Sequence, residues 1–418
     1  MAVVAASAFA VALLALALEL GHRTKIALVG ASLVVVLGAL DVETAIASID
    51  WATLGLLVGM MIIVGLTEPT GVFSYLALHI ARLSGGRPFR LIALLALMTA
   101  VLSAFLDNLT AILLVVPISL QLSRLLGLPV IPLVLVQVMA SNIGGTATLI
   151  GDPPNIMIGT HVEQLSFIDF IVNLGPVAAV TLLVTTLVLY GFYRRSLKPV
   201  PDARDRLTGL DPRAELKRDR LFRILAVLGG TIVGFFLHAP LHVEPVVVAM
   251  TGATVMLLVA GRELEWALER VEWGTIFFFV GLFVMVGALE ERGVIGSVAD
   301  AFAAVTGGSK TAEALVILWG AAAGSAVVDN IPFTAAMIPV VDELQADGFD
   351  DATWWALALG ACFGGNATLI AAAANVAAVS ALGRTGTRIS FLRFLAVGMP
   401  VTVVSLLIAT AYLLAFQL

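Results

Sequence analysis

Long apolar runs, separated by short polar stretches, account for most of this chain. The runs at about 3–20, 26–40, 51–67 and 170–193 are each long enough to cross a bilayer as a helix, at roughly 20 residues a crossing. A fifth run, at about 130–159, has the same character but carries small and polar residues in its middle. The pattern therefore predicts a helical membrane protein in which one span is interrupted.

The interruption reads S-N-I-G-G-T-A-T-L-I-G-D-P-P-N, from Ser141 to Asn155. Two adjacent glycines loosen the backbone, and Pro153 and Pro154 remove hydrogen-bond donors and clash with the preceding turn. At membrane depth, broken backbone is tolerated only where it faces protein or a water-filled cavity. A broken helix of this kind is the usual indication of a binding site in a transporter.

The interruption has a partner later in the chain, and so do many other positions. A shift of 222 residues aligns Trp51 with Trp273, Gly59 with Gly281, Pro117 with Pro339 and Asp107-Asn108 with Asp329-Asn330. A shift of 220 residues aligns Gly144-Gly145 with Gly364-Gly365 and Asn155 with Asn375. We therefore interpret the chain as two copies of one unit.

The charges indicate how the first copy lies in the membrane. Residues 194–223 contain ten of the 23 Lys and Arg residues, so the positive-inside rule places this linker in the cytoplasm. Arg90 and Arg124 can share that side only if residues 91–123 enter the membrane and return as a hairpin. The first copy then crosses the membrane five times.

An odd number of crossings turns the second copy over, so its hairpin, at about 311–341, enters from the outside. The predicted fold is an all-α polytopic membrane protein with two inverted-topology repeats, about ten transmembrane helices, two re-entrant hairpins and two broken helices. Its parts are a first repeat at 1–193, a cytoplasmic linker at 194–223, and a second repeat at 224–418 with its broken helix at about 353–380.

Composition supports the bilayer as the solvent and excludes several functions. Of the 418 residues, 60% are hydrophobic and 12% are charged; the net charge is −6, and no basic tract suggests nucleic acid. Cys362 is the only cysteine, so the chain has neither an internal disulfide nor a cysteine-rich metal site. Because no P-loop, paired-histidine motif or nucleophile elbow is present, we expect no enzyme, no cofactor and no resident metal.

Two aspartates, Asp107 and Asp329, lie at the predicted hairpin tips. A carboxylate deep in a bilayer costs at least a few kcal/mol, and it persists where it binds a cation, takes a proton or meets a buried partner. The alternative is that each Asp caps the helix that follows it, and the two roles are compatible.

A third aspartate, Asp152, is present in only one repeat, because Ala372 occupies the equivalent position. It suits a single proton or cation site; the alternative is a helix-start Asp before Pro153. We assign proton coupling to Asp107, Asp329 and Asp152. The hydroxyl and amide residues expected to bind substrate or ion with them, some of which must instead satisfy interrupted backbone groups, are Asn108, Thr110, Asn142, Thr146, Thr148, Asn155, Asn330, Thr334, Asn366, Thr368 and Asn375.

These motifs resemble those of the ion transporter superfamily. The resemblance lies in D-N-L-T at 107–110 with Pro117, the run 142–155, D-N-I-P-F-T at 329–334 and the run 359–370. The branch that the motifs most resemble looks like the arsenite–antimonite efflux family, which groups with the pigment-cell P protein and the NhaD-type sodium/proton antiporters. The resemblance implies a scaffold and a mobile transport unit made of hairpins and broken helices, often in a homodimer. Dicarboxylate carriers of the superfamily have Ser-Asn-Thr at the hairpin tips; both tips here carry Asp, which argues for a cation or an uncharged solute.

The sequence therefore predicts a secondary active transporter of the bacterial inner membrane. The leading hypothesis is proton-coupled efflux of arsenite or antimonite, whose neutral hydroxides Asn and Thr groups can hold. The alternatives are a sodium/proton antiporter that uses the same carboxylates and, from a different class, an anion channel as proposed for the P protein. The expected partners are H+, the small inorganic solute (arsenite, antimonite or Na+) and the lipid bilayer. A soluble ATPase partner is left open; without one, transport depends on an ion gradient.

Overall fold

The computed structural model describes residues 1–198, 202–209, 211–217, 220–261, 264–345, 348 and 350–418. Within these ranges the chain is helical, without a β-strand. The first half contains α1 (Ala2–Ala17), α2 (Arg23–Val36), α3 (Val42–Ala47), α4 (Trp51–Thr67), the 3₁₀-helix η1 (Glu68–Thr70), α5 (Val72–Leu83), α6 (Pro88–Phe105), α7 (Asn108–Leu126), α8 (Val130–Gly145), α9 (Pro153–His161) and α10 (Phe167–Tyr193). The linker contains α11 (Ala203–Thr208) and the 3₁₀-helix η2 (Pro212–Glu215).

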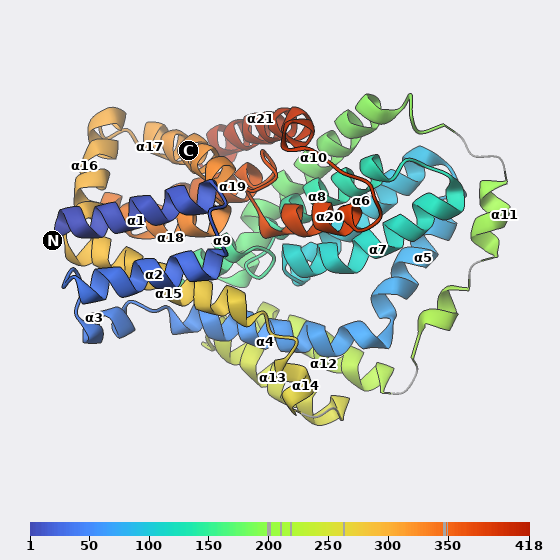
Figure 1. The fold of residues 1–418 in the computed structure, drawn as a ribbon, viewed down its shortest axis with the longest axis horizontal. Coiled ribbons are helices and arrows are strands. Elements are labelled where there is room, and N and C mark those ends of the chain that lie inside the picture. The colour runs from blue at the N-terminus through green and yellow to red at the C-terminus, as the bar shows by residue number, and fades with distance from the viewer. Residues whose placement is uncertain (199–201, 210, 218–219, 262–263, 346–347, 349) are drawn as a thin grey trace.

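The second half repeats the order of the first. It contains α12 (Leu221–Leu237), α13 (Pro245–Ala260), α14 (Leu264–Leu268), α15 (Trp273–Glu291), α16 (Val294–Thr306), α17 (Lys310–Val327), α18 (Asn330–Leu344), α19 (Asp351–Gly364), α20 (Ala373–Gly383) and α21 (Phe391–Phe416). The hairpins α6–α7 and α17–α18 lie toward opposite ends of the molecule, and their tips meet near its centre (Figure 1). Two hairpins entering from opposite ends agree with the predicted inversion.

The helices begin and end where the sequence supplies caps. Asp50 accepts a hydrogen bond from the Thr53 N–H (2.9 Å) at the start of α4. The side chains of Ser166 and Asp169 form a capping box at the start of α10. Helix α7 ends at Gly127, whose φ of +65° favours glycine. These local signals fix the ends of the helices on which the candidate site depends.

The helices form two bodies. The first, here called the frame, consists of α1–α4 and α12–α15, in which α4 packs on α13 and α2 packs on α15. The second, here called the hairpin unit, consists of α6–α9 and α17–α20, in which α6 packs on α8 and α17 packs on α19. The long helices α10 and α21 pack against each other and against the hairpin unit. The two breaks lie in the hairpin unit.

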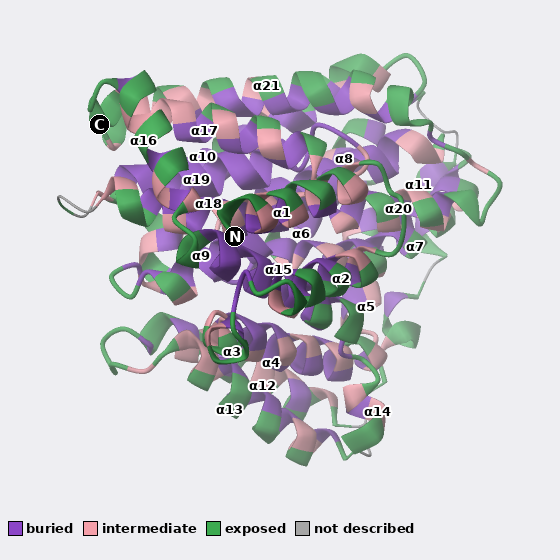
Figure 2. Ribbon diagram, turned by 60° about the vertical axis from the view of Figure 1, so that its left-hand side comes forward, coloured by how far each residue is buried: buried purple, intermediate pink, exposed green. Residues whose placement is uncertain are grey.

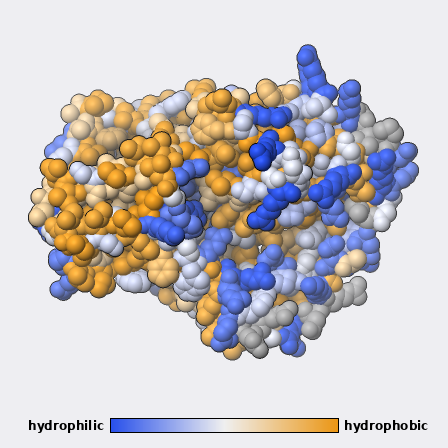
Figure 3. All heavy atoms as spheres, in the orientation of Figure 1, coloured by the Kyte–Doolittle hydropathy of each residue, from blue (hydrophilic) through white to orange (hydrophobic). Residues whose placement is uncertain are grey.

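Burial follows this division. Helices α8 and α19 are buried on nearly every side, while the exposed residues gather on the outer helices (Figure 2). Apolar side chains cover much of the surface where α1 and α16 lie, and hydrophilic side chains gather toward α5 and α11 (Figure 3). An apolar helix that is buried all round belongs to the core of a membrane protein, so the candidate site lies at the centre of the fold.

The membrane character of the fold is confirmed. Among the described helices, six are long and apolar enough to cross a membrane, or seven if the bent pair α16–α17 is one span, and six shorter ones are also apolar. The predicted hairpins correspond to α6–α7 and α17–α18, and the predicted broken helices to α8–α9 and α19–α20. The figure of about ten crossings, which rests on roughly 20 residues each, stays a prediction.

Sequence analysis does not predict the short helices α5 and α16, and part of the predicted linker lies outside the described residues. Helices α5 and α16 precede the two hairpins at equivalent places, and α16 meets α17 at an angle of 119°. Both are shorter than a membrane crossing, so the search for long apolar runs misses them. Of the predicted linker, residues 199–201, 210 and 218–219 lie outside the described residues.

Candidate functional site

Each broken helix lies against the first helix of a hairpin, and glycine makes this contact possible. A Cβ on Gly144 of α8 would lie 2.3 Å from the Ala100 carbonyl oxygen of α6. A Cβ on Gly364 of α19 would lie 2.6 Å from the Ala322 carbonyl oxygen of α17. Because no side chain fits at these positions, the glycines hold each break close to a hairpin tip.

Two asparagines satisfy the backbone that the breaks expose. Asn155, in the first turn of α9, donates its side-chain N–H to the Thr148 carbonyl oxygen (2.8 Å). Asn375, in the first turn of α20, donates to the Thr368 carbonyl oxygen (2.9 Å). A freed carbonyl at membrane depth needs such a partner. Because each amide nitrogen faces its break, each amide oxygen is left for other partners.

Four of the five predicted threonines bind backbone rather than the centre of the site. The hydroxyls of Thr148 and Thr368 donate to carbonyl oxygens at the ends of α6 and α17 and so tie each break to a hairpin tip. Thr146 and Thr334 donate to the carbonyl oxygens four residues earlier in the chain. All four lie in the buried region around the breaks.

The two tip aspartates cap the helices that follow them. Asp107 accepts hydrogen bonds from the Thr110 N–H (2.9 Å) and the Thr110 hydroxyl. Asp329 accepts a hydrogen bond from the Ile331 N–H (3.0 Å), and its φ of +146° is one that side chains disfavour. Both are partly exposed. This is the capping geometry that sequence analysis names as the alternative to ion binding.

Asp152 lies at the point where both hairpin tips and both breaks meet. Its side chain is fully buried, and its Oδ1 accepts hydrogen bonds from Asn108 (3.2 Å) and Asn330 (3.0 Å), one from each tip. Its Oδ2 is buried and, among the described residues, has no hydrogen-bond partner within bonding distance, while the Cys362 thiol also interacts with this carboxylate. A buried carboxylate oxygen without a partner is costly, so the arrangement favours a proton or a cation at this oxygen.

Further amides connect the two repeats around Asp152. Asn142 accepts from Asn108 (3.2 Å) and donates to the side-chain oxygens of Asn366 (2.9 Å) and Asn375 (3.2 Å). The amide nitrogen of Asn366 is buried and has no hydrogen-bond partner among the residues that the structure describes. All of these side chains are at least 95% buried. The structure thus brings one carboxylate and a group of amides together, whereas Asp107, Asp329 and the threonines support them from outside.

Cys362 is also at the centre of the fold. Its thiol is fully buried and lies 3.6 Å from the side-chain oxygen of Asn155. Sequence analysis does not include it among the site residues. Its place two residues before the glycine pair of the second break is the signal that points to it.

Arg23 is a candidate residue that sequence analysis misses. With Asp329 and Phe278, it lines a cavity of about 320 Å³ beside the second hairpin tip. Its guanidinium donates to the Thr275 hydroxyl (2.8 Å) and lies 5.6 Å from the centre of the Phe278 ring. The repeat offers a signal, because Arg23 begins α2 whereas Pro245 begins the equivalent helix α13.

A second cavity separates the frame from the first hairpin. It has a volume of about 490 Å³, and Thr110, Glu272 and Ala377 are among the residues that line it. The exposed side chains of Glu68 and Arg384 also belong to its wall. This cavity runs along α7 from the tip toward Arg124, and so lies on the side where sequence analysis places the cytoplasm.

Comparison with known proteins agrees with this architecture. The family model described as a citrate transporter, CitMHS, matches residues 13–360, which is most of the chain. The chain belongs to the CitMHS family. The chain is 41% identical to an uncharacterized transporter of Mycobacterium tuberculosis and 39% identical to the 46 kDa membrane protein of Mycobacterium leprae. Each alignment covers 99% of this chain and 98% of the relative.

Two further relatives extend the comparison. The mouse P protein is 33% identical over 95% of this chain, which spans 58% of the P protein. This confirms the resemblance to the ion transporter superfamily and to the P protein. The chain also resembles the crystal structure of the Alcanivorax borkumensis YdaH transporter, with a TM-score of 0.61. The match covers 94% of this chain and 97% of that transporter, and because the sequences are 14% identical, it shows a likeness of fold. With its family model and its mycobacterial relatives, the chain is a membrane transporter of the CitMHS family.

Proposed function

We propose that this protein is a proton-coupled secondary transporter of the bacterial inner membrane and that Asp152 carries the proton. The observation behind the proposal is the Asp152 side chain, which is fully buried where both hairpins and both breaks meet and whose Oδ2 has no hydrogen-bond partner within bonding distance among the described residues. A proton on Oδ2 removes the charge that the bilayer disfavours. Because Oδ1 binds one amide from each tip, the ion on this carboxylate acts on both hairpins together.

The proposal narrows the coupling role predicted for three aspartates to one. Asp107 and Asp329 accept hydrogen bonds from the first turns of α7 and α18. They position the tips from which Asn108 and Asn330 reach Asp152. In this view the tip carboxylates maintain the shape of the site, and the binding and release of the proton take place at its centre.

Arsenite or antimonite is the solute that we assign first. The side chains described around Asp152 are neutral amides and the Cys362 thiol, which suit a small uncharged hydroxide. Citrate, the substrate in the family's description, carries several negative charges that Asp152 would repel, although Arg23 lies in the neighbouring cavity. A homodimeric assembly also remains part of the proposal.

Sodium/proton antiport is the second candidate, and a specific observation favours it. The amide nitrogens of Asn155 and Asn375 bind the breaks, so their oxygens lie on the side of Asp152 and its neighbours. Carboxylate and amide oxygens are the ligands that hard cations prefer. Na+ and H+ would then compete for Oδ2.

Proteoliposomes that contain a pH-sensitive dye test these assignments. Arsenite, NaCl and citrate are added separately to wild type, Asp152→Asn and Asp300→Asn, the last a matched loss of charge at an exposed position on α16. Proton movement triggered by arsenite in wild type and Asp300→Asn, and lost in Asp152→Asn, supports the proposal.

A response to NaCl alone selects the antiporter, and a response to citrate alone selects an anionic solute. Normal coupling in Asp152→Asn would remove this residue from the mechanism. Flux of an anion without proton movement would favour the channel.

A further inference from the structure

The cavity of about 320 Å³ that Arg23 lines has one wall from the frame and one from the hairpin unit. The frame wall includes Arg23 at the start of α2 and Phe278 of α15. The other wall includes Leu109 and Asp329, each next in sequence to a tip asparagine that donates to Asp152. The turn between α1 and α2 accordingly lies close to the place where the hairpin tips meet (Figure 1). A solute in this cavity is therefore beside the proposed proton site.

Arg23 is fixed on the frame and keeps donors for the cavity. The Thr24 hydroxyl donates to the Gly274 carbonyl oxygen (2.7 Å), which holds the start of α2 on α15. The Arg23 guanidinium, which has five N–H donors, gives one to the Thr275 hydroxyl (2.8 Å). Among the described residues, no acid lies within ion-pair distance of Arg23. Donors of a positively charged group therefore remain for a molecule in the cavity.

The charges of the cavity favour one class of solute. Among the described residues that line it, the charged ones are Arg23, Asp329 and, at an exposed position, Glu19. Asp329 binds the Ile331 N–H through Oδ1, and its Oδ2 has no hydrogen-bond partner in the described part of the chain. A multiply charged anion such as citrate would meet two carboxylates, and a bare cation such as Na+ would meet the guanidinium. A small uncharged hydroxide can accept from Arg23 and donate to Asp329.

The equivalent place in the other repeat has no such donor. Pro245 begins α13 as Arg23 begins α2. Pro245 lines a cavity of about 560 Å³ with Gly159 and Thr160, near the end of α9, whereas Arg23 shares its cavity with Ala373, at the start of α20. In the opposite state of an inverted repeat, these two relations exchange, and Pro245 comes to the start of α9. Because the proline side chain has no hydrogen-bonding group, the solute then has no partner equivalent to Arg23.

We propose that this cavity holds the transported solute, an uncharged hydroxide, in the state that the structure shows, and that Arg23 donates to the solute oxygens. The inference rests on the proposed function and adds a solute site beside the proton site at Asp152. Since Arg23 stays with the frame when the hairpin unit moves, the affinity for the solute falls in the opposite state. The adjoining cavity, which shares Ala377 with this one, lies on the predicted cytoplasmic side. Tight binding on that side and weak binding on the other suit export.

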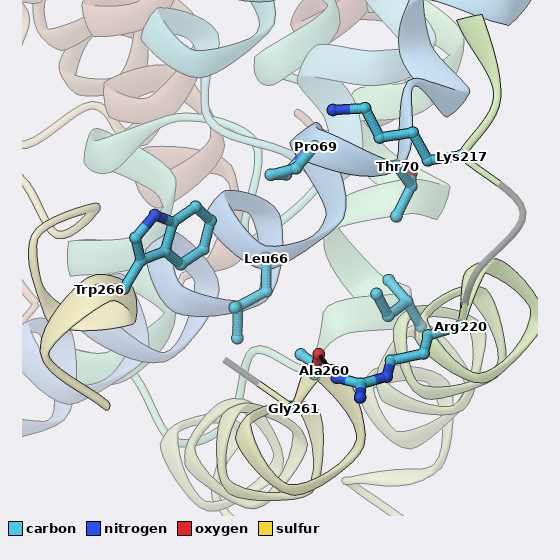
Figure 4. Close-up of a pocket in the computed structure, with 9 residues that line it drawn as sticks. Leu66, Pro69, Thr70, Lys217, Arg220, Ala260, Gly261 and Trp266 are labelled. Atoms are coloured by element: carbon cyan, nitrogen blue, oxygen red, sulfur yellow. Dashed lines mark hydrogen bonds between the residues drawn. The ribbon is translucent and has the colours of Figure 1, made fainter. Parts of the chain in front are cut away.

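Arsenite exchange in membrane vesicles of both orientations tests the proposal. The vesicles contain arsenite, and the entry of radiolabelled arsenite gives the KM at the face presented to the medium, which is the predicted cytoplasmic face in inside-out vesicles. The variants are Arg23→Gln, Arg23→Lys and, as a matched control, Arg220→Gln. Arg220 is also a frame arginine at the start of a helix, and its guanidinium donates to the Ala260 carbonyl oxygen (2.6 Å) in a cavity of about 350 Å³ (Figure 4). None of the described residues that line that cavity belongs to a hairpin.

Arg23→Gln should raise the KM for arsenite about tenfold in inside-out vesicles, as expected for one lost hydrogen bond to a charged group, and leave it unchanged in right-side-out vesicles. Arg220→Gln should change neither value. An equal rise on both faces, or no rise on either, would overturn the site. If Arg23→Gln does not fold, Arg23→Lys decides: its single ammonium should raise the KM about threefold on the inside-out face alone.

The same vesicles separate this site from the proposed function. Exchange proceeds without a pH gradient, so wild type that exchanges arsenite with the expected effect of Arg23→Gln supports the site even if no proton moves. Wild type that couples arsenite to protons while Arg23→Gln keeps a normal KM would overturn the site alone. Wild type that exchanges no arsenite would overturn the solute assignment and this site together.

Discussion

The frame meets the hairpin unit at two places that the internal repeat makes equivalent, and the two differ. At the first, Asp50 at the start of α4 accepts hydrogen bonds from Thr53 and from Thr160 of α9 (3.1 Å). At the second, Glu272 at the start of α15 accepts from Thr275 (3.1 Å), but the cavity of about 490 Å³ separates it from α20. The acidic residue at the helix start thus contacts the hairpin unit in the first repeat, whereas a cavity separates the two in the second repeat.

A pair of equivalent phenylalanines shows the same difference. Phe167, which begins α10, is fully buried against Phe235 and Phe236 of the frame. Phe391, which begins α21, is 42% exposed. The hairpin unit and the adjoining α10 are therefore closed against the frame on the predicted outer side, whereas the equivalent contacts of α20 and α21 are open on the predicted cytoplasmic side. Alternating access in an inverted repeat requires two equivalent contacts, of which only one is formed at a time.

Fixing the closed contact should have the largest effect. In a Cys362→Ser background, Asp50→Cys combined with Thr160→Cys places two thiols where the side chains now share a hydrogen bond. Bridging them with Hg²⁺ should abolish transport, because the frame and the hairpin unit can no longer separate there. Treatment with excess dithiothreitol, which is washed out before the flux assay because it binds arsenite, should restore it. The measurement is solute flux in proteoliposomes.

The single variant Thr160→Cys in the same background is the control and should keep its flux after the reagent. Full transport by the bridged double variant would show that this contact persists throughout the cycle.

Weakening the closed contact should have a smaller effect. Thr160→Val keeps the shape of the side chain but loses the hydroxyl that bonds to Asp50 and Thr53. One such hydrogen bond contributes about 1 kcal/mol, so local opening should become about fivefold more frequent. Amide hydrogen exchange of α9 should accelerate by that factor. Ser380→Ala, at the equivalent open position, should leave the exchange of α20 unchanged, and equal acceleration in both would contradict the comparison.

Removing the two helix-start acids should affect stability unequally. Asp50→Ala loses the cap of α4 and the contact with Thr160, which together should lower Tm by about 2 °C or more. Among the described residues, the Thr275 hydroxyl is the one side-chain hydrogen-bond partner of Glu272, so Glu272→Ala should lower Tm by less than about 1 °C. Differential scanning fluorimetry measures both. A larger loss in Glu272→Ala would mean that the open side is the more stable contact.

The smallest effect should come from His238, in the loop after α12. Its Nε2 accepts a hydrogen bond from the Phe167 N–H (3.0 Å), so the ring must be neutral at this nitrogen, and burial lowers the pKa of His238 below its ordinary value. A lowered pKa in the folded state means that the stabilisation is complete above about pH 6.5 and is lost as the pH falls below it.

Between pH 8 and pH 5.5, wild type should lose more thermal stability than His238→Gln, by about 1 to 2 °C. His242→Gln, at an exposed position in the same loop, should behave like wild type. An identical loss in wild type and His238→Gln would exclude this histidine as the cause.

The order of the helices could be predicted from the sequence because its signals are local. Paired glycines and prolines mark the breaks, and the recurrence at 222 residues identifies the equivalent hairpins. The short helices α5 and α16 lack such a signal. Their length is below that of a membrane crossing, so only their packing against the hairpins reveals them.

The site was harder to predict than the fold. Asp107, Asp152 and Asp329 are all acidic residues in apolar surroundings, and the sequence alone does not rank them. Packing separates them, because the tip aspartates bind the backbone of their own helices whereas Asp152 receives amides from both tips. Arg23 enters the neighbouring cavity only because α2 packs on α15, a contact between distant parts of the chain.

The single carboxylate at the centre of two equivalent repeats also determines how the membrane voltage acts. In the proposed cycle, the hairpin unit with a proton on Asp152 differs by one elementary charge from the same unit without it. Moving one charge across the whole membrane field changes the free energy by about 2.3 kcal/mol per 100 mV. The movement of the hairpin unit with a proton on Asp152 and its movement without that proton must therefore respond differently to voltage. A cell with an energised membrane would favour one direction of transport even at equal pH on both sides.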